Sequence, residues 1–201
     1  MMEWTAFEDQ ARTEGYTCIC GIDEAGRGPL AGPVYAAAVV FRPGQVIEGV
    51  NDSKKLSEKK REALFDTICS QCAAYGIGSA TEKEIDEINI LNATYLAMQR
   101  AVAALPVQPD CALVDGNRAP DLPLEVRTII KGDAQSASIA AASILAKVSR
   151  DRYMLQMAEK YPQYAFEKHK GYGTKLHYER LEQYGISPIH RLSFLKKWMN
   201  R

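Results

Sequence analysis

The stretch CICGIDEAGRGPLAGPVYAAAVVF, residues 18–41, decides the fold. Two apolar runs of β-forming residues, 17–23 and 33–41, frame it, and a segment rich in glycine and proline joins them. A third such run covers residues 46–50 and is again set off by a turn. Short apolar runs separated by turn residues are typical of strands. This part of the chain therefore predicts antiparallel strands.

The chain beyond this stretch alternates between helical and extended patterns. Ser57 is a candidate cap for a helix over residues 58–75, and Thr81-Glu82-Lys83-Glu84 matches a capping box that opens a helical region running to about residue 105. Further elements are expected as a short strand at 76–80, strands at 111–114 and 126–130, an Ala-rich helix from near Ser136, and helices at about 174–184 and 191–199. Strands followed by alternating strand and helix predict one α/β domain, residues 1–201, with a mixed sheet and the last helices packed alongside it.

Acidic residues end three of the strand-like runs. They are Asp23 with Glu24, Asp115, and Asp133, and each is followed closely by a glycine or a turn. Taken singly, they could be a solvated strand end, a turn and a helix cap. Taken together they indicate a site, because the ends of parallel strands converge on one crevice and carboxylates gathered there repel one another unless a cation intervenes. Oxygen ligands favour Mg²⁺ or Mn²⁺, and two such ions can activate water and stabilise the leaving oxygen of a phosphodiester.

Glu24 sets a geometric constraint on that site. Neighbouring residues of a strand point to opposite faces, so Asp23 and Glu24 cannot both aim their side chains at one ion from regular β structure. Glu24 is therefore expected to lie past the end of the strand, or to contribute through its backbone carbonyl or a water molecule.

The glycine-rich segment after the first strand matches a dinucleotide-binding motif only in form. Gly26-Arg27-Gly28-Pro29-Leu30-Ala31 fits G-x-G-x-x-[G/A], but that motif needs a helix directly after it. The residues that follow, from Gly32-Pro33 onward, read as extended. The remaining use of such a loop is close approach of the backbone to a ligand such as a sugar, because glycine has no Cβ to obstruct it.

The residues now quoted carry a resemblance to one family. The segment GIDEAGRGPLAGPV, residues 21–34, resembles the signature of ribonuclease HII. Other segments agree with that family in the same order: NDSKKLS at 51–57, VDGN at 114–117, KGD at 131–133, AASILAKV at 141–148, HKGYGT at 169–174 and RLSF at 191–194. The resemblance implies an RNase H-like mixed five-stranded sheet flanked by helices, with Asp23, Glu24, Asp115 and Asp133 as the acidic residues that bind two divalent ions, Mg²⁺ or Mn²⁺.

The resemblance also implies how the substrate is bound. Backbone groups of Gly26, Arg27 and Gly28 would contact the 2′-hydroxyl of a ribonucleotide, the group that separates RNA from DNA, and Tyr172 would stack on the neighbouring deoxyribose. The family carries basic residues at the positions of Lys54, Lys55, Lys147 and Lys170, which are candidate phosphate contacts or ordinary solvated lysines. His169 is a candidate proton shuttle, with a structural or phosphate-facing role as the alternative. Some relatives add a C-terminal helical tail that helps to hold the duplex, so this chain is expected either to bind the duplex less tightly or to rely more on its basic face.

Charge is distributed unevenly along the chain. Residues 1–130 carry 12 Lys and Arg against 19 Asp and Glu, a net charge of −7, and residues 131–201 carry 13 against 6, a net of +7. This suits an acidic metal site beside a basic surface for phosphates. No apolar stretch is long enough for a membrane span, and the five cysteines indicate reduced thiols, Cys69 and Cys72 included, in place of a disulfide framework. We expect a cytoplasmic monomer.

Three functions remain open on the sequence. The main hypothesis is hydrolysis by metal-activated water on the 5′ side of a ribonucleotide in duplex DNA, or in an RNA:DNA hybrid, leaving 3′-hydroxyl and 5′-phosphate ends. A second keeps the fold but makes the protein a general nuclease or a type 1 ribonuclease H that needs long hybrids. A third is a nucleic-acid-binding module without activity, which conflicts with the four retained carboxylates.

Overall fold

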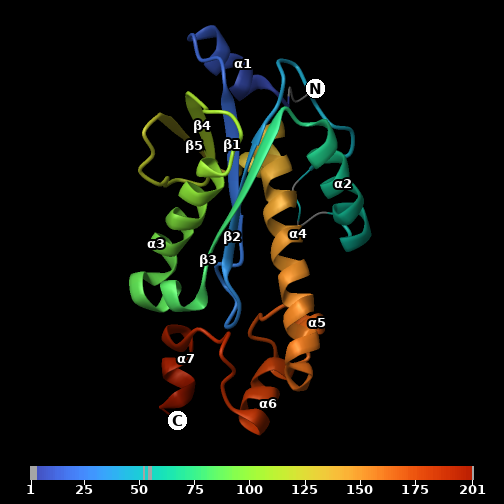
Figure 1. The fold of residues 1–201 in the computed structure, drawn as a ribbon, viewed down its shortest axis with the longest axis vertical. Coiled ribbons are helices and arrows are strands. Elements are labelled where there is room, and N and C mark those ends of the chain that lie inside the picture. The colour runs from blue at the N-terminus through green and yellow to red at the C-terminus, as the bar shows by residue number, and fades with distance from the viewer. Residues whose placement is uncertain (1–3, 52, 54–55, 201) are drawn as a thin grey trace.

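A five-stranded sheet forms the centre of the computed structural model, which describes residues 4–51, 53 and 56–200. The strand order is β3-β2-β1-β4-β5 (Figure 1). β2 pairs antiparallel with both β1 and β3, whereas β4 runs parallel to β1 and β5 runs parallel to β4. The strands are β1 (Ile19–Ala25), β2 (Val34–Val40), β3 (Ala74–Ala80), β4 (Cys111–Asp115) and β5 (Glu125–Ile129). The predicted mixed sheet of five strands is confirmed.

Helices cover both faces of this sheet. α3 packs on one face, chiefly against β2 and β3, and α4 packs on the other, against β1 and β2 (Figure 1). α2 lies beside α4. The helices are α1 (Ala6–Thr13), α2 (Glu58–Gln71), α3 (Glu82–Ala103), α4 (Ala137–Lys160), α5 (Phe166–His169), α6 (Lys175–Tyr184) and α7 (Leu192–Met199), with short 3-10 turns η2 (Gly132–Ala134) and η3 (Pro162–Tyr164). No helix of the described ranges is long and apolar enough to cross a membrane.

The alternation of side chains along the central strands explains this layered packing. Cys20 and Ile22 of β1 join the cluster on the α3 face. The residue between them is Gly21, on which a Cβ would stand 2.3 Å from the Ile139 amide nitrogen of α4. Successive residues of a strand face opposite ways, so the larger side chains fill one layer while glycine admits the α4 backbone on the other.

Most of the expected elements are present, with three corrections. The capping box of Thr81 and Glu84 is confirmed. Residues 46–50, predicted as a strand, form loops and turns, and the helix predicted to reach residue 75 ends at Gln71. Helix α1 was not predicted. Prolines and glycines at positions 43, 44 and 49 bend the chain around 46–50 before it can pair with a neighbouring strand.

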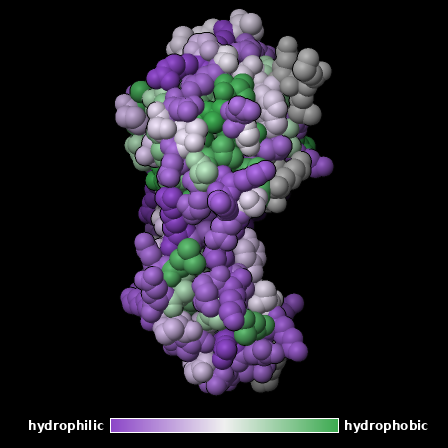
Figure 2. Space-filling view, turned by 90° about the vertical axis from the view of Figure 1, so that its right-hand side faces the viewer, coloured by the Kyte–Doolittle hydropathy of each residue, from purple (hydrophilic) through white to green (hydrophobic). Residues whose placement is uncertain are grey.

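The C-terminal helices gather at one end of the molecule, next to the connection between β1 and β2 (Figure 1). Backbone hydrogen bonds join the two: the Leu30 amide donates to the Gly171 carbonyl at 2.8 Å, and the Gly32 amide donates to the Ile189 carbonyl at 2.9 Å. Figure 2 shows the molecule narrowing between the sheet and these helices, with a hollow on one edge of a largely hydrophilic face. The glycine loop thus lies where the sheet meets the C-terminal segment.

Candidate active site

Two of the predicted carboxylates stand at the carboxyl ends of neighbouring parallel strands. Ile22 of β1 pairs with Val114 of β4. The next residues, Asp23 and Asp115, therefore lie side by side and face the same way. Asp23 is buried, at 5% exposure, and its carboxylate accepts a hydrogen bond from the Glu24 amide at 2.7 Å. The edge of the sheet thus holds two acidic side chains in fixed register.

Asp133 reaches the same edge through the turn that follows β5. The Oδ1 atom of Asp115 accepts a hydrogen bond from the Gly132 amide at 2.6 Å and a longer one from the Asp133 amide at 3.4 Å. A Cβ on residue 132 would stand 2.6 Å from Cδ1 of Ile139, so glycine lets the turn pack closely on that side chain. One carboxylate therefore fixes the turn that carries the next.

Glu24 lies within β1, where it pairs with Ala36. Of the predicted alternatives, the one that places Glu24 past the end of the strand is therefore wrong. Its side chain leaves the sheet on the face opposite to Asp23, and Nη1 of Arg27 donates to its Oε1 at 3.3 Å. From this position Glu24 could share a cation with Asp23 through its backbone carbonyl or through a water molecule, as the sequence also allows.

The electrostatics of Asp23 tie the four acidic residues together. Burial raises the pKa of Asp23 well above its ordinary value of 3.8, and the charges of Glu24, Asp115 and Asp133 raise it further. The hydrogen bond from the Glu24 amide acts in the opposite direction. A group that is both desolvated and surrounded by like charges is costly to ionise. A cation placed among these side chains would reverse that cost.

The donor set suits a hard divalent cation, because it consists of carboxylate oxygens. Within the described ranges, no group of three or more His, Cys, Asp or Glu side chains is gathered closely enough to hold an ion as it stands. The carboxylates would have to draw together around the ion. Burial and the neighbouring charges both raise the pKa of Asp23, and a bound cation would offset both effects.

A pocket of about 240 Å³ opens beside these carboxylates and collects most of the predicted site. Its lining comes from the end of β1, the glycine loop, the end of β4, α4 and the loop before α6. The lining residues are Asp23, Glu24, Ala25, Gly26, Arg27, Gly28, Ser53, Asp115, Ser143, Lys147 and Tyr172. Residues far apart in the sequence therefore share one concave surface.

Tyr172 and Lys147 contribute an aromatic and a basic side chain to the lining of the pocket. Tyr172 is 43% exposed, and Nζ of Lys147 stands 6.0 Å from the centre of its ring. The same ammonium donates to Oδ1 of Asp151, one helical turn further along α4, at 2.8 Å. The arrangement offers a ligand an aromatic face next to a positive charge.

The other predicted basic residues and His169 are placed differently. Nζ of Lys170 donates to the Glu167 carbonyl at 2.7 Å, close to it in the chain. His169 is buried, with Nε2 at 3.0 Å from the Tyr164 carbonyl and Nδ1 accepting from the Gly171 amide. Both ring nitrogens are used by the backbone, which favours the structural role over a proton shuttle. Lys54 and Lys55 lie outside the described residues.

Sequence reasoning missed several polar residues around the pocket. The Ser143 hydroxyl donates to the Ser53 hydroxyl at 2.7 Å, and both side chains are buried. Arg150 and Arg191 are fully buried behind the glycine loop. Ser53, Ser143 and Arg191 fall within the segments 51–57, 141–148 and 191–194 that resemble the family, which is the signal that could have found them.

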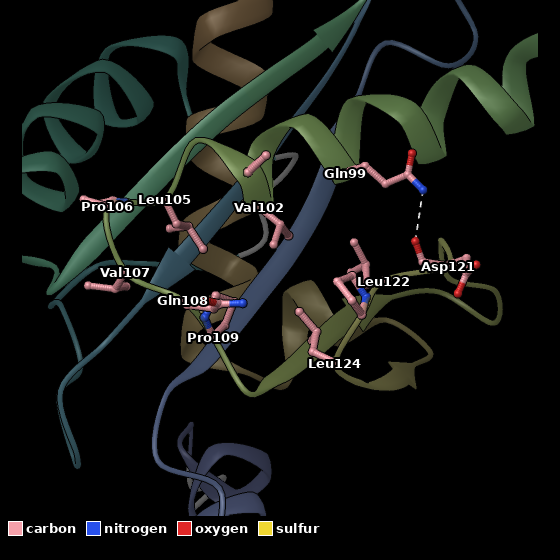
Figure 3. A pocket seen from close by; sticks show the side chains of 12 residues that line it. Gln99, Val102, Leu105, Pro106, Val107, Gln108, Pro109, Asp121, Leu122 and Leu124 are labelled. Atoms are coloured by element: carbon pink, nitrogen blue, oxygen red, sulfur yellow. Dashed lines mark hydrogen bonds between the residues drawn. The ribbon is translucent and has the colours of Figure 1, made fainter.

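A larger pocket, of about 570 Å³, lies at the opposite ends of β4 and β5 (Figure 3). It is bounded by the end of α3 and by the segments that lead into the two strands, and Gln99 spans its rim by donating to the Asp121 carbonyl at 3.0 Å. Its lining is mainly aliphatic, from residues such as Val102, Leu105 and Leu122. Size alone does not make it the reactive site, since the acidic residues lie at the other end of the sheet.

Solved structures define the class of fold. The ribonuclease H2 of Pyrococcus horikoshii OT3 matches with a TM-score of 0.73 at 30% sequence identity, over 88% of this chain and 93% of that one. Bst-RNase HIII in complex with Mn²⁺ matches with a TM-score of 0.63 at 18% identity, over 87% of this chain and 65% of that one. The fold is RNase H-like.

Sequence comparison defines the family. The family model for ribonuclease HII matches residues 20–197. A ribonuclease HII of Caldicellulosiruptor bescii is 60% identical over 189 residues, which cover 94% of this chain and 92% of the relative. The chain belongs to the ribonuclease HII family. It is thus a ribonuclease H, a nuclease.

Proposed function

We propose that this protein hydrolyses the phosphodiester bond on the 5′ side of a ribonucleotide embedded in duplex DNA, and also cuts the RNA of RNA:DNA hybrids. The observation that carries the proposal is the pocket in which carboxylates, a glycine loop and an exposed tyrosine meet. Carboxylates at strand ends supply hydrolytic chemistry, and the other two elements supply recognition of a sugar. The role is removal of ribonucleotides from DNA.

The acidic residues are assigned to metal binding. Asp23, Asp115 and Asp133 would hold divalent ions, Mg²⁺ or Mn²⁺, through their side chains, and Glu24 would contribute through its carbonyl or a water molecule. When bound, two such ions activate the attacking water and stabilise the leaving oxygen. The residues of the chain keep these ligands in register: the pairing of β1 with β4 sets Asp23 against Asp115, and Asp115 holds the turn of Asp133.

The glycine loop and Tyr172 are assigned to reading the sugar. Gly26, Arg27 and Gly28 lie against the pocket, and a Cβ on residue 28 would stand only 3.9 Å from the Tyr172 ring. A ribose with its 2′-hydroxyl would lie against the loop backbone, and the next deoxyribose would stack on the tyrosine. Because the 2′-hydroxyl is both donor and acceptor, backbone groups are suited to recognise it.

Basic residues are assigned to the phosphates. Lys147 lines the pocket and is the described lysine best placed for this role; we assign Lys54, Lys55 and Lys170 to flanking phosphates. We also propose that the protein acts as a monomer. The free cysteines, Cys18, Cys20, Cys69, Cys72 and Cys111, suit a reducing compartment and hence the cytoplasm.

Three duplexes of one sequence test the proposal. One carries a single ribonucleotide, one is DNA throughout, and one is a continuous RNA:DNA hybrid, each incubated with Mg²⁺, with Mn²⁺ or with a chelator. We expect cleavage of the first and third with metal, and none of the second or with chelator. Cleavage of the hybrid alone would indicate a type 1 activity, and cleavage of all three would indicate a general nuclease; either result would overturn the proposal.

A further inference from the structure

Two arginines lie fully buried directly behind the glycine loop. Arg150, on α4, and Arg191, just before α7, both have 0% exposure. A buried guanidinium is costly unless hydrogen bonds replace its hydration. Burial lowers the pKa of both groups, that of Arg191 to about 9, which still leaves Arg191 charged at neutral pH. The burial of two guanidinium groups is explained by their hydrogen bonds to the backbone.

Arg191 is bonded to the loop backbone through three nitrogens. Nε donates to the Gly32 carbonyl at 2.8 Å, Nη1 to the Arg27 carbonyl at 3.0 Å and Nη2 to the Gly26 carbonyl at 2.6 Å. The planar guanidinium presents its donors in a rigid fork. It therefore fixes the orientation of two successive peptide groups, those that follow Gly26 and Arg27.

Those two peptide groups carry the amides of Arg27 and Gly28. In a planar trans peptide the carbonyl and the following N–H point in opposite directions. Because the carbonyls of Gly26 and Arg27 face Arg191, the amides of Arg27 and Gly28 face away from it. The same residues line the pocket beside Asp23. Arg191 thus directs two backbone donors outward at the place assigned to the sugar.

Arg150 joins this loop to the segment that carries Tyr172. Nε donates to the Pro33 carbonyl at 3.2 Å and Nη2 to the Ala31 carbonyl at 3.0 Å, while Nη1 donates to the Lys170 carbonyl at 3.0 Å. Its Cζ also stands 5.7 Å from the centre of the Tyr172 ring. A Cβ on residue 26 would stand 2.1 Å from Nε, so the loop lies directly on the guanidinium.

We propose that Arg150 and Arg191 are positioning residues for recognition of the ribonucleotide: Arg191 aims the Arg27 and Gly28 amides at the 2′-hydroxyl, and Arg150 fixes the spacing between that loop and the Tyr172 ring. The inference rests on the proposed function, which assigns the loop and the tyrosine to the sugar. Neither arginine is assigned a contact with substrate.

Conservative variants separate positioning from general stability. Arg191→Lys and Arg150→Lys keep the charge but lose the three-pronged geometry. Arg152→Lys, two residues along α4 from Arg150 and with a side chain 42% exposed, is the matched control. We expect KM for the single-ribonucleotide duplex to rise about tenfold in the two buried variants, a loss of roughly 1.4 kcal/mol of binding, and to stay unchanged in the control. Circular dichroism and the melting temperature report whether each variant is folded.

Two results would overturn the inference. One is a folded Arg191→Lys protein with the wild-type KM. The other is a fall in kcat in proportion to the loss of folded protein at unchanged KM, which is what a purely structural role predicts. If the wild-type protein does not cleave the single-ribonucleotide duplex, the proposed function is wrong. That result is distinct from the two above, in which the wild-type protein is active and only the inference about the arginines is wrong.

A measurement on the wild-type protein covers the case in which the variants do not fold. Amide resonances of Arg27 and Gly28 are followed by NMR while metal-free protein is titrated with the single-ribonucleotide duplex, and again with the all-DNA duplex. We expect these two amides to shift more with the ribonucleotide than with DNA. Equal shifts with both duplexes would contradict the assignment of these donors to the 2′-hydroxyl.

Discussion

At position 23 the chain holds a carboxylate that its surroundings disfavour in the charged form. Burial and three neighbouring acidic residues all raise the pKa of Asp23. Structural carboxylates are usually placed where charge is stabilised, so an arrangement that destabilises charge is typical of a site that awaits a cation. A cation bound beside Asp23 would offset this cost of ionisation.

Replacing one carboxylate tests this interpretation. Asp23→Asn, Asp115→Asn and Asp133→Asn are each expected to lose most cleavage, because a metal ligand is removed. Melting temperature without metal is expected to hold or rise, since like-charge repulsion is relieved while the amide oxygen introduced by Asp23→Asn can still accept from the Glu24 amide. Cleavage assays with saturating metal, paired with thermal melts in chelator, provide the measurement. Turnover near the wild-type rate in one variant would remove that residue from the site.

Tyr172 is tested by separating its ring from its hydroxyl. If the ring stacks on deoxyribose, Tyr172→Ala should slow cleavage at a single ribonucleotide by roughly ten- to a hundredfold, because stacking contributes about 1–3 kcal/mol. Tyr172→Phe should retain most activity. The loss in the alanine variant should be smaller on a continuous hybrid. Equal losses on both substrates, together with a lower melting temperature, would instead identify Tyr172 as a packing residue.

The acidic site residues could be predicted from the sequence and the two buried arginines could not, for a physical reason. Asp23, Asp115 and Asp133 each end an apolar run, which is a local pattern that can be seen without the fold. Arg150 lies among other charged residues of α4, a pattern typical of an exposed helical face. Its three carbonyl partners are distant in the sequence. Only the tertiary contacts show that this side chain is fully buried.

Strand β3 shows how sequence spacing sets the distance between a helix and the sheet. Its glycines alternate along the strand on the face toward α3, and a Cβ on residue 78 would stand 2.4 Å from the Ala97 carbonyl. Gly78→Ala is therefore expected to lower the free energy of unfolding by about 1–3 kcal/mol through overpacking. Ser79→Ala, on the opposite face of the same strand, should change it by less than about 0.5 kcal/mol. Denaturant unfolding measures both, and equal effects would contradict the packing argument.

The segment from η3 to α7 contains three buried histidines, His169, His177 and His190, whose pKa values are lowered by burial. His177 and His190 share a hydrogen bond of 2.9 Å between their Nε2 atoms, and Nδ1 of His177 lies 2.9 Å from the Tyr172 carbonyl. Burial first, and the neighbouring histidines second, lower the pKa of His177 from its ordinary 6.5 to about 4 and that of His190 to about 3. This cluster supports the loop that carries Tyr172.

Its pH dependence follows from the sign of those shifts. Between about pH 6.5 and 4 the unfolded chain binds protons at these histidines while the folded protein does not, so stability is full above the unfolded pKa of 6.5 and is lost as the pH falls. Each histidine contributes a slope of up to about 1.4 kcal/mol per pH unit. His190→Gln should make the free energy of unfolding less dependent on pH. The raised pKa of Asp23 affects stability in the opposite direction, so the change in this variant reports the histidine contribution alone. An unchanged slope in denaturant unfolding would show that the cluster is not responsible.

Element boundaries were predictable where the signal is local and failed where it is not. The capping box of Thr81 and Glu84 was readable directly. The kink of α3 was not: Asn89 adopts a φ of 67° and its Oδ1 accepts from the amides of Leu91 and Asn92, restarting the helix. The asparagine reads as an ordinary helical residue in sequence, because nothing local distinguishes a restart from a continuous helix.

In the whole molecule, the two halves of the chain bring complementary parts to one pocket. The acidic half supplies Asp23, Glu24 and Asp115, and the basic half supplies Lys147 and Tyr172. The pocket therefore combines acidic side chains from one half of the chain with a lysine and a tyrosine from the other. The sheet order was predictable only as a mixed sheet, because the pairing of β1 with β4 depends on contacts between segments that are far apart in the sequence.

The chemistry of the cut ends tests the central claim most directly. A duplex with one ribonucleotide is cleaved with Mg²⁺ or Mn²⁺, and the products are weighed by mass spectrometry. Hydrolysis by water on the 5′ side of the ribonucleotide predicts one fragment that ends in a 3′-hydroxyl and another that begins with a 5′-phosphate on the ribonucleotide. A 2′,3′-cyclic phosphate would show that the substrate's own hydroxyl attacked, and would contradict an account in which that hydroxyl is recognised and water is the nucleophile.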